Sequence, residues 1–419
     1  MTTTGQPCDP VARTGTVREV LQAFAKLGVS SFGGPIAHLG YFRTEFVVKR
    51  RWLDEPAFAD LVALCQFLPG PASSQVAFAL GLMRAGCAGG LAAWTGFTLP
   101  SAIALFAFAY GASALHGPSG AAILHGLKLA AVAIVAQAVW GMARTLCPDR
   151  RRASIAAVTA GLILISPSPL AQMGVILFGG ISGLWLCRAA PSAPTGHVSV
   201  SVSRRVGVLS LFAFFLLLGG LPVLRSLNSS HSVALFEAFY RSGALVFGGG
   251  HVVLPLLRAA VVAPGWVSDD VFLAGYGAAQ AIPGPLFTFS AYLGAVEGPL
   301  PNGALGAVVS LVAIFLPGML VLTGTLPFWE TFRNITRAQA IMRGVNAAVV
   351  GLLGAALYSP IWTSSVRTPG DVAVALVSFA LLTAWRAPPL LVVLISALGG
   401  IALAQLPPFY LSGQPGSMR

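Results

Sequence analysis

The sequence has 419 residues, of which 56% are hydrophobic and only 9% are charged, and its mean hydropathy is +0.81. Soluble domains carry roughly 25% charged residues, so this composition excludes a soluble globular protein and indicates a membrane protein with several spans. The net charge of +12 fits basic cytoplasmic loops or an anionic cargo, and no large soluble segment remains to bind nucleic acid. Five scattered cysteines without metal-ligand spacing predict no disulfide framework, no metal site and no cofactor.

The first elements along the chain are short. The polar amino terminus lacks the apolar core of a signal peptide, and Thr16-x-x-Glu19 predicts the capped start of an amphipathic helix that ends at SSFGGP, residues 30–35. A basic loop over 43–51 precedes Trp52. Apolar runs 57–68 and 71–83 then flank Pro69-Gly70-Pro71, which no helix crosses smoothly. Each run is too short for a span, so the pair predicts two half helices of a re-entrant segment.

The remaining apolar runs are longer. Runs 88–112, 121–143, 206–224, 303–326 and 388–406 can each cross the bilayer, since about 20 residues suffice. Runs 153–166 and 170–187 are expected to cross and return. We therefore expect an all-α polytopic membrane protein with broken or re-entrant helices.

The first half of the sequence is repeated in the second. Gln66-x-x-Pro69-Gly70-Pro71 matches Gln280-x-x-Pro283-Gly284-Pro285, and a tryptophan, Trp52 or Trp266, precedes each glutamine by 14 residues. The segments 24–34 and 239–249, the Leu-Pro pairs at 99–100 and 316–317, and the segments 125–135 and 343–353 match in the same order. Such self-similarity predicts a tandem duplication. The expected domains are a first repeat over 1–188, a linker with an extra span over 189–230, and a second repeat over 231–419.

Charges predict that the two copies are inverted. The loop before Trp52 is basic and its counterpart before Trp266 carries only Arg258, whereas the uncharged loop 111–120 corresponds to the basic segment 327–343. Basic loops lie on the cytoplasmic side, so equivalent loops are expected on opposite sides of the membrane. The extra span 206–224 would produce this inversion, which is common in secondary transporters.

The interrupted helices predict an anion site. A helix with Pro71 at its first position presents the unpaired amides of residues 72–74 and a partial positive charge, and the hydroxyls of Ser73 and Ser74 add donors. Inverted copies would bring two such starts together near the midplane. The expected substrate-binding residues are Gly33, Gly34, Gln66, Pro69, Gly70, Pro71, Ser73, Ser74, Lys128, Gly248, Gly249, Gln280, Pro283, Gly284, Pro285 and Thr288. Further candidates are Lys26, Arg241 and Asn346.

Each of these features also has a structural interpretation. The Pro-Gly-Pro segments also fit plain turns between membrane helices. Lys26 and Arg241 also fit cations that reach the membrane interface, and Lys128 fits either such a cation or a functional group within a span. His38 and His251 more often represent packed residues than proton carriers. Pairing of the breaks in both copies, each with a glutamine, favours a substrate site.

The blocks FGGP…W…QFLPGP and FGGGH…W…QAIPGP resemble the chromate ion transporter family in its long-chain, two-domain form. The resemblance covers residues 17–406 and rests on the doubled motif. It implies a multi-pass inner-membrane protein that exports chromate from the cytoplasm and confers chromate resistance. It also places the family's residues here at Phe32, Gly33, Gly34, Gln66, Pro69, Gly70, Pro71 and Lys128, and at Phe247, Gly248, Gly249, Gln280, Pro283, Gly284 and Pro285.

Several alternatives remain open at this point. Sulfate has the shape and charge of chromate, so a transporter of sulfate or another oxyanion fits the same residues. A membrane scaffold or an integral membrane enzyme is less well supported, because the sequence lacks a catalytic constellation at matching depth. It also lacks an ATP-binding loop of the form GxxxxGK[ST], which favours secondary transport. Proton coupling and a homodimer are left open.

Overall fold

The computed structural model describes residues 15–32, 34–114, 118–166, 168–187, 202–228, 230–247, 252–329 and 335–405. Within these ranges the chain forms helices and connecting loops, without a strand. Five helical segments there are long and apolar enough to cross a membrane: Ala72–Gly111, Gly120–Leu146, Arg204–Leu227, Gly303–Phe328 and Thr336–Ser365. The prediction of an all-helical polytopic membrane protein is confirmed.

The first half begins with short helices arranged as hairpins. These are α1 (Val17–Ser30), α2 (Gly34–Phe42), the π-helix η1 (Arg43–Lys49), α3 (Glu55–Phe67) and α4 (Ala72–Ala114). The basic loop expected before Trp52 is thus helical up to Lys49. Helix α4 reverses at Ala85 and Gly86, whose dihedral angles are non-helical, and the backbones of Gly81 and Gly89 touch across this hairpin. The expected half helices therefore correspond to α3 and the first part of α4.

The second half repeats this order. Its helices are α9 (His231–Ala244), α10 (Val253–Val261), α11 (Asp269–Ala281), the short 3₁₀ helix η3 (Leu286–Thr288), α12 (Phe289–Val296), α13 (Gly303–Thr325) and η4 (Leu326–Phe328). Gly294 and Gly306 touch across the turn between α12 and α13, as Gly81 and Gly89 do in the first half. Two short helices again meet at a Pro-Gly-Pro turn and lead into a long apolar helix.

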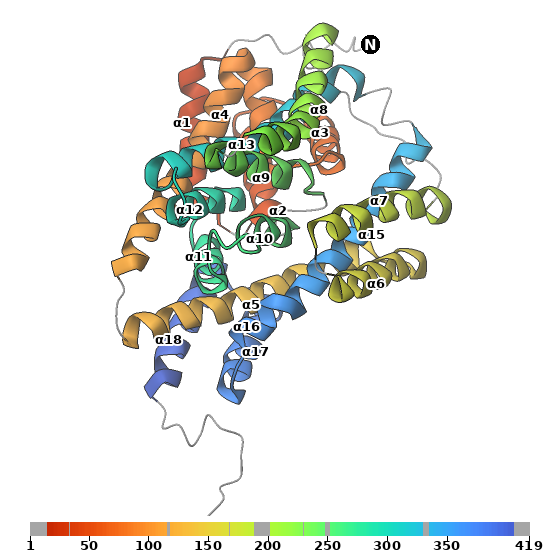
Figure 1. Ribbon diagram of the computed structural model, residues 1–419. Coiled ribbons are helices and arrows are strands. Elements are labelled where there is room, and N and C mark those ends of the chain that lie inside the picture. Colours follow the sequence, from red (N-terminus) through yellow and green to blue (C-terminus); the bar gives the residue numbers. More distant parts are fainter. Residues whose placement is uncertain are drawn as a thin grey trace, which may run out of the picture.

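The last helices of each half pack on the other half. In the first half these are α5 (Pro118–Leu146), α6 (Arg150–Ile165) and α7 (Pro169–Leu186). In the second they are α15 (Thr336–Ala356), η5 (Leu357–Trp362), α16 (Thr363–Ser365), α17 (Pro369–Thr383) and α18 (Pro389–Gln405). Helix α5 contacts α17 and α18, and α15 contacts α6 and α7 (Figure 1). Small residues permit both contacts, because Gly126 meets the backbone of Ser396 and Gly344 meets that of Gly179.

Helix α8 (Arg204–Leu227) connects the halves and matches the expected extra span. Its apolar side chains Val208, Leu209, Phe212, Phe215 and Leu216 are exposed, as is typical of a helix that faces lipid. Helix α8 packs mainly on α13 and α9 of the second half. It therefore adds one crossing between the two repeats without entering the contact between them.

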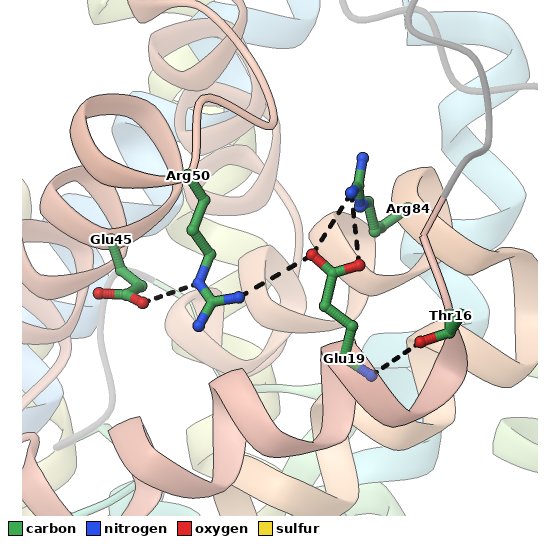
Figure 2. Close-up of polar contacts among 5 residues, drawn as sticks. All are labelled: Thr16, Glu19, Glu45, Arg50 and Arg84. Atoms are coloured by element: carbon green, nitrogen blue, oxygen red, sulfur yellow. Dashed lines mark hydrogen bonds and ion pairs between the residues drawn. The ribbon is translucent and has the colours of Figure 1, made fainter.

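The first hairpins are joined at their open ends by charged residues (Figure 2). The amide of Glu19 donates to the Thr16 hydroxyl at 3.1 Å, as the capping pattern predicts. The Glu19 carboxylate pairs with Arg84 at 3.3 Å and approaches Arg50 at 3.9 Å. Arg84 also lies over the ring of Trp52 at 5.3 Å. We call these residues, Glu19, Arg50, Trp52 and Arg84, the Trp52 cluster.

An equivalent cluster joins the open ends of the second hairpins. The imidazole of His231, at the start of α9, lies 4.5 Å from the ring of Trp266. Its Nε2 atom lies 3.1 Å from the carboxylate of Glu297, in the turn after α12. We call His231, Trp266 and Glu297 the Trp266 cluster. The tryptophan position is shared by the halves, whereas the charges around it differ.

Candidate functional site

The two Pro-Gly-Pro turns each bind the opposite half of the chain. The amide of Gly70 donates a hydrogen bond of 2.7 Å to the carbonyl of Val246. The amide of Gly284 donates one of 3.0 Å to the carbonyl of Ser31. Ser31 and Val246 are equivalent in the repeat, since each stands one residue before the Phe-Gly-Gly sequence. Each half therefore contributes one donor turn and one acceptor segment to the contact between the halves.

Glycine is required at both turns by backbone geometry and by space. Gly70 has a φ of +119° and Gly284 a φ of +113°, values that other residues rarely adopt. A Cβ atom at Gly70 would lie 2.9 Å from the Cα of Gly318, and one at Gly284 would lie 2.6 Å from the hydroxyl of Ser101. Gly318 and Ser101 follow the matched Leu-Pro pairs. Each turn is thus pressed against the proline-containing helix of the other half.

The first turn presents a helix start with free donors. Pro71 is the residue before α4, because its carbonyl accepts the first helical bond, from the amide of Gln75 at 2.9 Å. The sequence predicted Pro71 as the first residue of the helix, whereas Ala72 holds that position. The amides of Ala72, Ser73 and Ser74 consequently have no acceptor within the helix. Their N–H groups and the helix dipole make this end attractive to an anion.

The second turn offers fewer donors. It leads into the 3₁₀ helix η3, in which both the amide and the hydroxyl of Thr288 donate to the carbonyl of Pro285, at 3.0 and 2.7 Å. The expected donor Thr288 is therefore occupied within its own turn. Gln280 precedes this turn, and its Nε2 atom has no hydrogen-bond partner among the described residues. The two turns share a backbone shape and differ in side-chain chemistry.

Buried polar atoms around the two turns lack partners. The atoms without a hydrogen-bond partner among the described residues include Ser31 Oγ, Ser74 Oγ, Gln75 Oε1, Thr98 Oγ1, Gln280 Nε2 and Ser290 Oγ. Buried polar groups are nearly always paired with protein or water, and an unpaired one costs about 1–3 kcal/mol. Several such atoms in one region indicate a place that receives a polar ligand or water.

Two further residues support this region: Gln75, which no sequence motif singles out, and His38, which the sequence marks as a packed residue. The side-chain amide of Gln75 donates from Nε2 to the carbonyls of Pro69 at 2.9 Å and Gly318 at 3.0 Å. It thereby holds the first turn against α13. His38 donates from Nε2 to the carbonyl of Ser31 at 3.2 Å, and its Nδ1 lies 3.5 Å from the hydroxyl of Ser73. The sequence signal for both was a lone polar residue close to a break.

Lys128 lies in a different region from the turns. Its ammonium group forms a hydrogen bond of 2.8 Å with Asp270, in the first turn of α11. Gln280 lies near the opposite end of α11, about 15 Å along the helix axis. Lys128 lines a cavity of about 660 Å³, together with His125, Asp270 and Arg367. The structure thus separates Lys128 from the other expected binding residues.

The remaining expected residues have varied surroundings. Lys26 and Gln66 are exposed, and Gly34, in the left-handed region at φ +77°, has open space around it. Arg241 pairs with the buried Glu237 at 3.2 Å, and Asn346 has a buried Oδ1 atom without a partner among the described residues. Gly33, Gly248 and Gly249, like His251, lie outside the described residues.

A second cavity of about 580 Å³ opens near the turns. Its lining includes Phe32, Gln137, Arg144 and Arg386. Phe32 follows Ser31, which binds the second turn. Helix α5 lines both cavities, one near Lys128 and the other near Arg144. Between them, buried apolar residues of α5, α11, α17 and α18 are packed together: Leu127, Ala130, Ala133, Ile134, Ala278, Leu382, Val392 and Val393.

Comparison with known proteins places the chain in a family. The sequence model described as chromate transporter matches residues 18–184 and again residues 233–401. A chromate transport protein of Pseudomonas aeruginosa is 28% identical over 91% of this chain and 90% of its own length. A chromate transport protein of Cupriavidus metallidurans is 26% identical over 93% and 94%. The uncharacterized transporter YwrA of Bacillus subtilis is 26% identical over 42% of this chain and 99% of its own length.

No solved structure matches the chain significantly. The curated relatives named as chromate transport proteins match over most of their own length as well as most of this chain. The family's sequence model likewise covers most of the chain, in two successive matches. The chain therefore belongs to the chromate transporter family, a family of transporters and not of enzymes.

Proposed function

We propose that the chain is a secondary transporter that exports chromate across the inner membrane and thereby confers chromate resistance. Family membership and the absence of an ATP-binding loop in the sequence support this proposal. A membrane potential that is negative inside favours the exit of anions. The gain is ~2.3 kcal/mol per charge per 100 mV, or ~4.6 kcal/mol for a dianion. The potential therefore favours export of a dianion, and proton antiport would add to this driving force.

The proposed transporter consists of two inverted repeats, approximately 1–188 and 231–419. Three observations support this arrangement. Each Pro-Gly-Pro turn binds the opposite half, each late helix packs on the opposite half, and the Trp52 and Trp266 clusters occupy equivalent places. The basic segments around Trp52 would then face the cytoplasm, and the Trp266 cluster would face outward.

Chromate binds, in this proposal, where the two turns meet. The observation that carries it is a group of buried polar atoms at the turns that lack a partner among the described residues, among them Ser31 Oγ, Ser74 Oγ and Gln280 Nε2. A tetrahedral dianion accepts hydrogen bonds from amides and hydroxyls, which these residues and the start of α4 supply. Such a ligand would satisfy the donors that have no partner within the described part of the chain.

The two cavities on α5 would give this site access from both sides. The cavity at Arg144 adjoins the basic segment 144–152, which is expected in the cytoplasm. The cavity at Lys128 adjoins the uncharged loop before α5, expected outside. The packed small residues between them, such as Ala130 and Ala278, separate the two. Movement of α5 against α11 would open one cavity and close the other.

The test is chromate flux into proteoliposomes containing the full chain and its Ser74→Ala variant. The Ser74 hydroxyl has no partner among the described residues, so we expect its removal to leave the melting temperature unchanged. Loss of one hydrogen bond to a charged ligand weakens binding by about 1.5–3 kcal/mol, so KM rises at least about tenfold. Sulfate is added as a competitor, because it has the same shape and charge.

Ser378→Ala is the matched control. The Ser378 hydroxyl is buried between α17 and α18 and lies 2.8 Å from that of Ser396, away from the turns. We expect this variant to melt at a lower temperature with an unchanged KM. Equal KM values for Ser74→Ala and the wild type would remove the first turn from the binding site. Transport of sulfate with no flux of chromate would assign the chain to the alternative substrate.

A further inference from the structure

The cavity at Lys128 contains more charge than the transport motif predicts. Lys128, His125 and Arg367 lie around Asp270, which forms a hydrogen bond of 2.8 Å with Lys128 and also interacts electrostatically with Arg367 and His125. These residues come from α5, from α11 and from the loop before α17. The cavity therefore lies between the two halves, and its volume of about 660 Å³ exceeds what a single ion pair needs.

The two acidic groups near this cavity are held very differently. Asp371 is buried and accepts hydrogen bonds from His125 at 2.7 Å, from the amide of Arg367 at 3.0 Å and from the amide of Thr368 at 2.9 Å. It caps α17 and is fixed there. Asp270, in contrast, is bound through its contact with Lys128 and lies at the mouth of the cavity. One carboxylate is structural, and the other is free to turn away.

The solvent exposure of the two side chains indicates which of them, Lys128 or Asp270, can rotate out of the ion pair. The Lys128 side chain is only 8% exposed, whereas that of Asp270 is 64% exposed. A carboxylate that rotates into water keeps its hydration, so its departure costs little. A buried ammonium group left without a counter-ion is costly, because its charge is then neither solvated nor paired. Asp270 therefore leaves readily only when another anion takes its place.

We propose that this cavity is an outer vestibule for tetrahedral oxyanions, in which Asp270 is a displaceable counter-ion of Lys128. This inference rests on the proposed transport function. An entering dianion replaces the Asp270 carboxylate and is held between Lys128 and Arg367, with His125 at its edge. When the anion departs, Asp270 returns to Lys128 and closes the site again.

This arrangement favours dianions over monoanions. A monoanion would exchange one negative charge for another and would gain little. A dianion pairs with both Lys128 and Arg367, so it outweighs the single charge of Asp270. The vestibule would then select chromate or sulfate against chloride. Asp270 thus prevents the abundant monoanions from pairing with the buried ammonium group of Lys128.

The experiment measures binding of [³⁵S]sulfate and [⁵¹Cr]chromate to the purified full chain by equilibrium dialysis. Asp270→Asn removes the competing charge and keeps the shape of the side chain, so both anions bind roughly tenfold more tightly. The same variant no longer discriminates against chloride as a competitor. Lys128→Gln and Arg367→Gln each weaken binding by at least about tenfold.

Asp269→Asn is the control, because it removes the same charge one residue away. Asp269 pairs with Arg258 at 2.7 Å, and neither residue lines the cavity. The Asp269→Asn variant is expected to bind sulfate and chromate with the affinity of the wild type. Equal or weaker binding by monodisperse Asp270→Asn protein would overturn the proposal, as would an equal gain in Asp269→Asn, which indicates a general field effect. Wild-type protein that transports chromate while Asp270→Asn binds it unchanged would refute the vestibule alone. A wild type that does not transport, yet tightens binding through Asp270→Asn, would refute the transport function alone.

Discussion

Replacement of Gly70 by alanine tests the contact between the two halves. The residue has a φ of +119°, which an alanine reaches only at a cost of about 1–3 kcal/mol. Its Cβ atom would also stand 2.9 Å from the Cα of Gly318 and 3.0 Å from Nε2 of Gln75. The first of these is backbone, so relief requires movement of the turn or of α13. Such a shift weakens the hydrogen bond from Gly70 to Val246, which contributes about 1 kcal/mol.

The expected total is therefore a loss of about 2–4 kcal/mol in the free energy of unfolding. A displacement of about 1 Å at the binding region further reduces the transport rate, by at least about tenfold. The melting temperature of the detergent-purified chain reports the first effect. Chromate flux into proteoliposomes reports the second. Flux is compared at equal amounts of inserted protein, so that loss of function is separated from loss of insertion.

Gly86→Ala provides the matched control. Gly86 has a φ of +66° and a ψ of −160°, a backbone conformation that favours glycine, and a Cβ there would meet nothing within 4 Å. It lies at the hairpin bend of α4, away from the contact between halves. We expect a cost of about 1–3 kcal/mol from the backbone alone, with normal flux. If Gly70→Ala matches Gly86→Ala in both stability and flux, the close approach to Gly318 has no functional weight and the reasoning is refuted.

Further predictions concern the second turn and the two tryptophan clusters. Gly284→Ala lowers the free energy of unfolding, because the new Cβ meets Ser101. Adding Ser101→Gly to the same chain restores about 1–2 kcal/mol of that free energy. If the effects of the two substitutions were additive, the contact would be contradicted. Arg84→Gln lowers the free energy of unfolding by about 1 kcal/mol with unchanged KM, and an equal loss in a Glu19→Gln background would show that the pair is not coupled. Burial raises the pKa of Glu297, in the turn between α12 and α13, from 4.5 to about 8. The folded chain then binds the proton more tightly than the unfolded chain, so stability falls as pH rises from about 4.5 through 8. In Glu297→Gln the melting temperature depends less on pH over this range. If the melting temperatures of the variant and the wild type changed with pH in parallel, the assignment would be contradicted.

Local features of the sequence predicted the individual helices well. The run 121–143 lies within α5, the run 206–224 within α8, and the short runs 57–68 and 71–83 correspond closely to α3 and the first part of α4. Length of an apolar run and the position of proline and glycine act within a few residues, so they are legible without knowledge of the fold. The same holds for the predicted cap at Thr16, whose hydroxyl accepts from the amide of Glu19 at 3.1 Å.

Contacts between distant segments were outside the reach of such reasoning. The sequence marked Lys128 as an ionisable group within a span, but its partner Asp270 is 142 residues away. Lys26 and Arg241 occupy aligned positions, and yet one is exposed and the other pairs with Glu237. A repeat predicts equivalent backbone positions, whereas a side chain's partner depends on which element the other half brings next to it.

The two turns show how a duplicated scaffold can hold a single binding site. The features that both turns share belong to the main chain. Each turn has a glycine with a positive φ, a hydrogen bond from that glycine's amide to a carbonyl of the other half, and a close fit against a small residue. These contacts need no particular side chain beyond glycine. The second, third and fourth positions after each turn diverge, with Ser73, Ser74 and Gln75 in the first half.

In the second half the same positions hold Phe287, Thr288 and Phe289, which fill space or bond within their own turn. Both phenylalanine side chains are almost completely buried, so they exclude water and ions from the start of α12. The dianion would therefore bind to the start of α4, while the second turn supplies the wall and the amide of Gln280. Equal donors on both turns would instead create two competing sites within one membrane depth, and like charges that close repel each other. In the proposed function, divergence of the side chains on a preserved backbone would thus leave one anion site at the two turns, separate from the vestibule at Lys128.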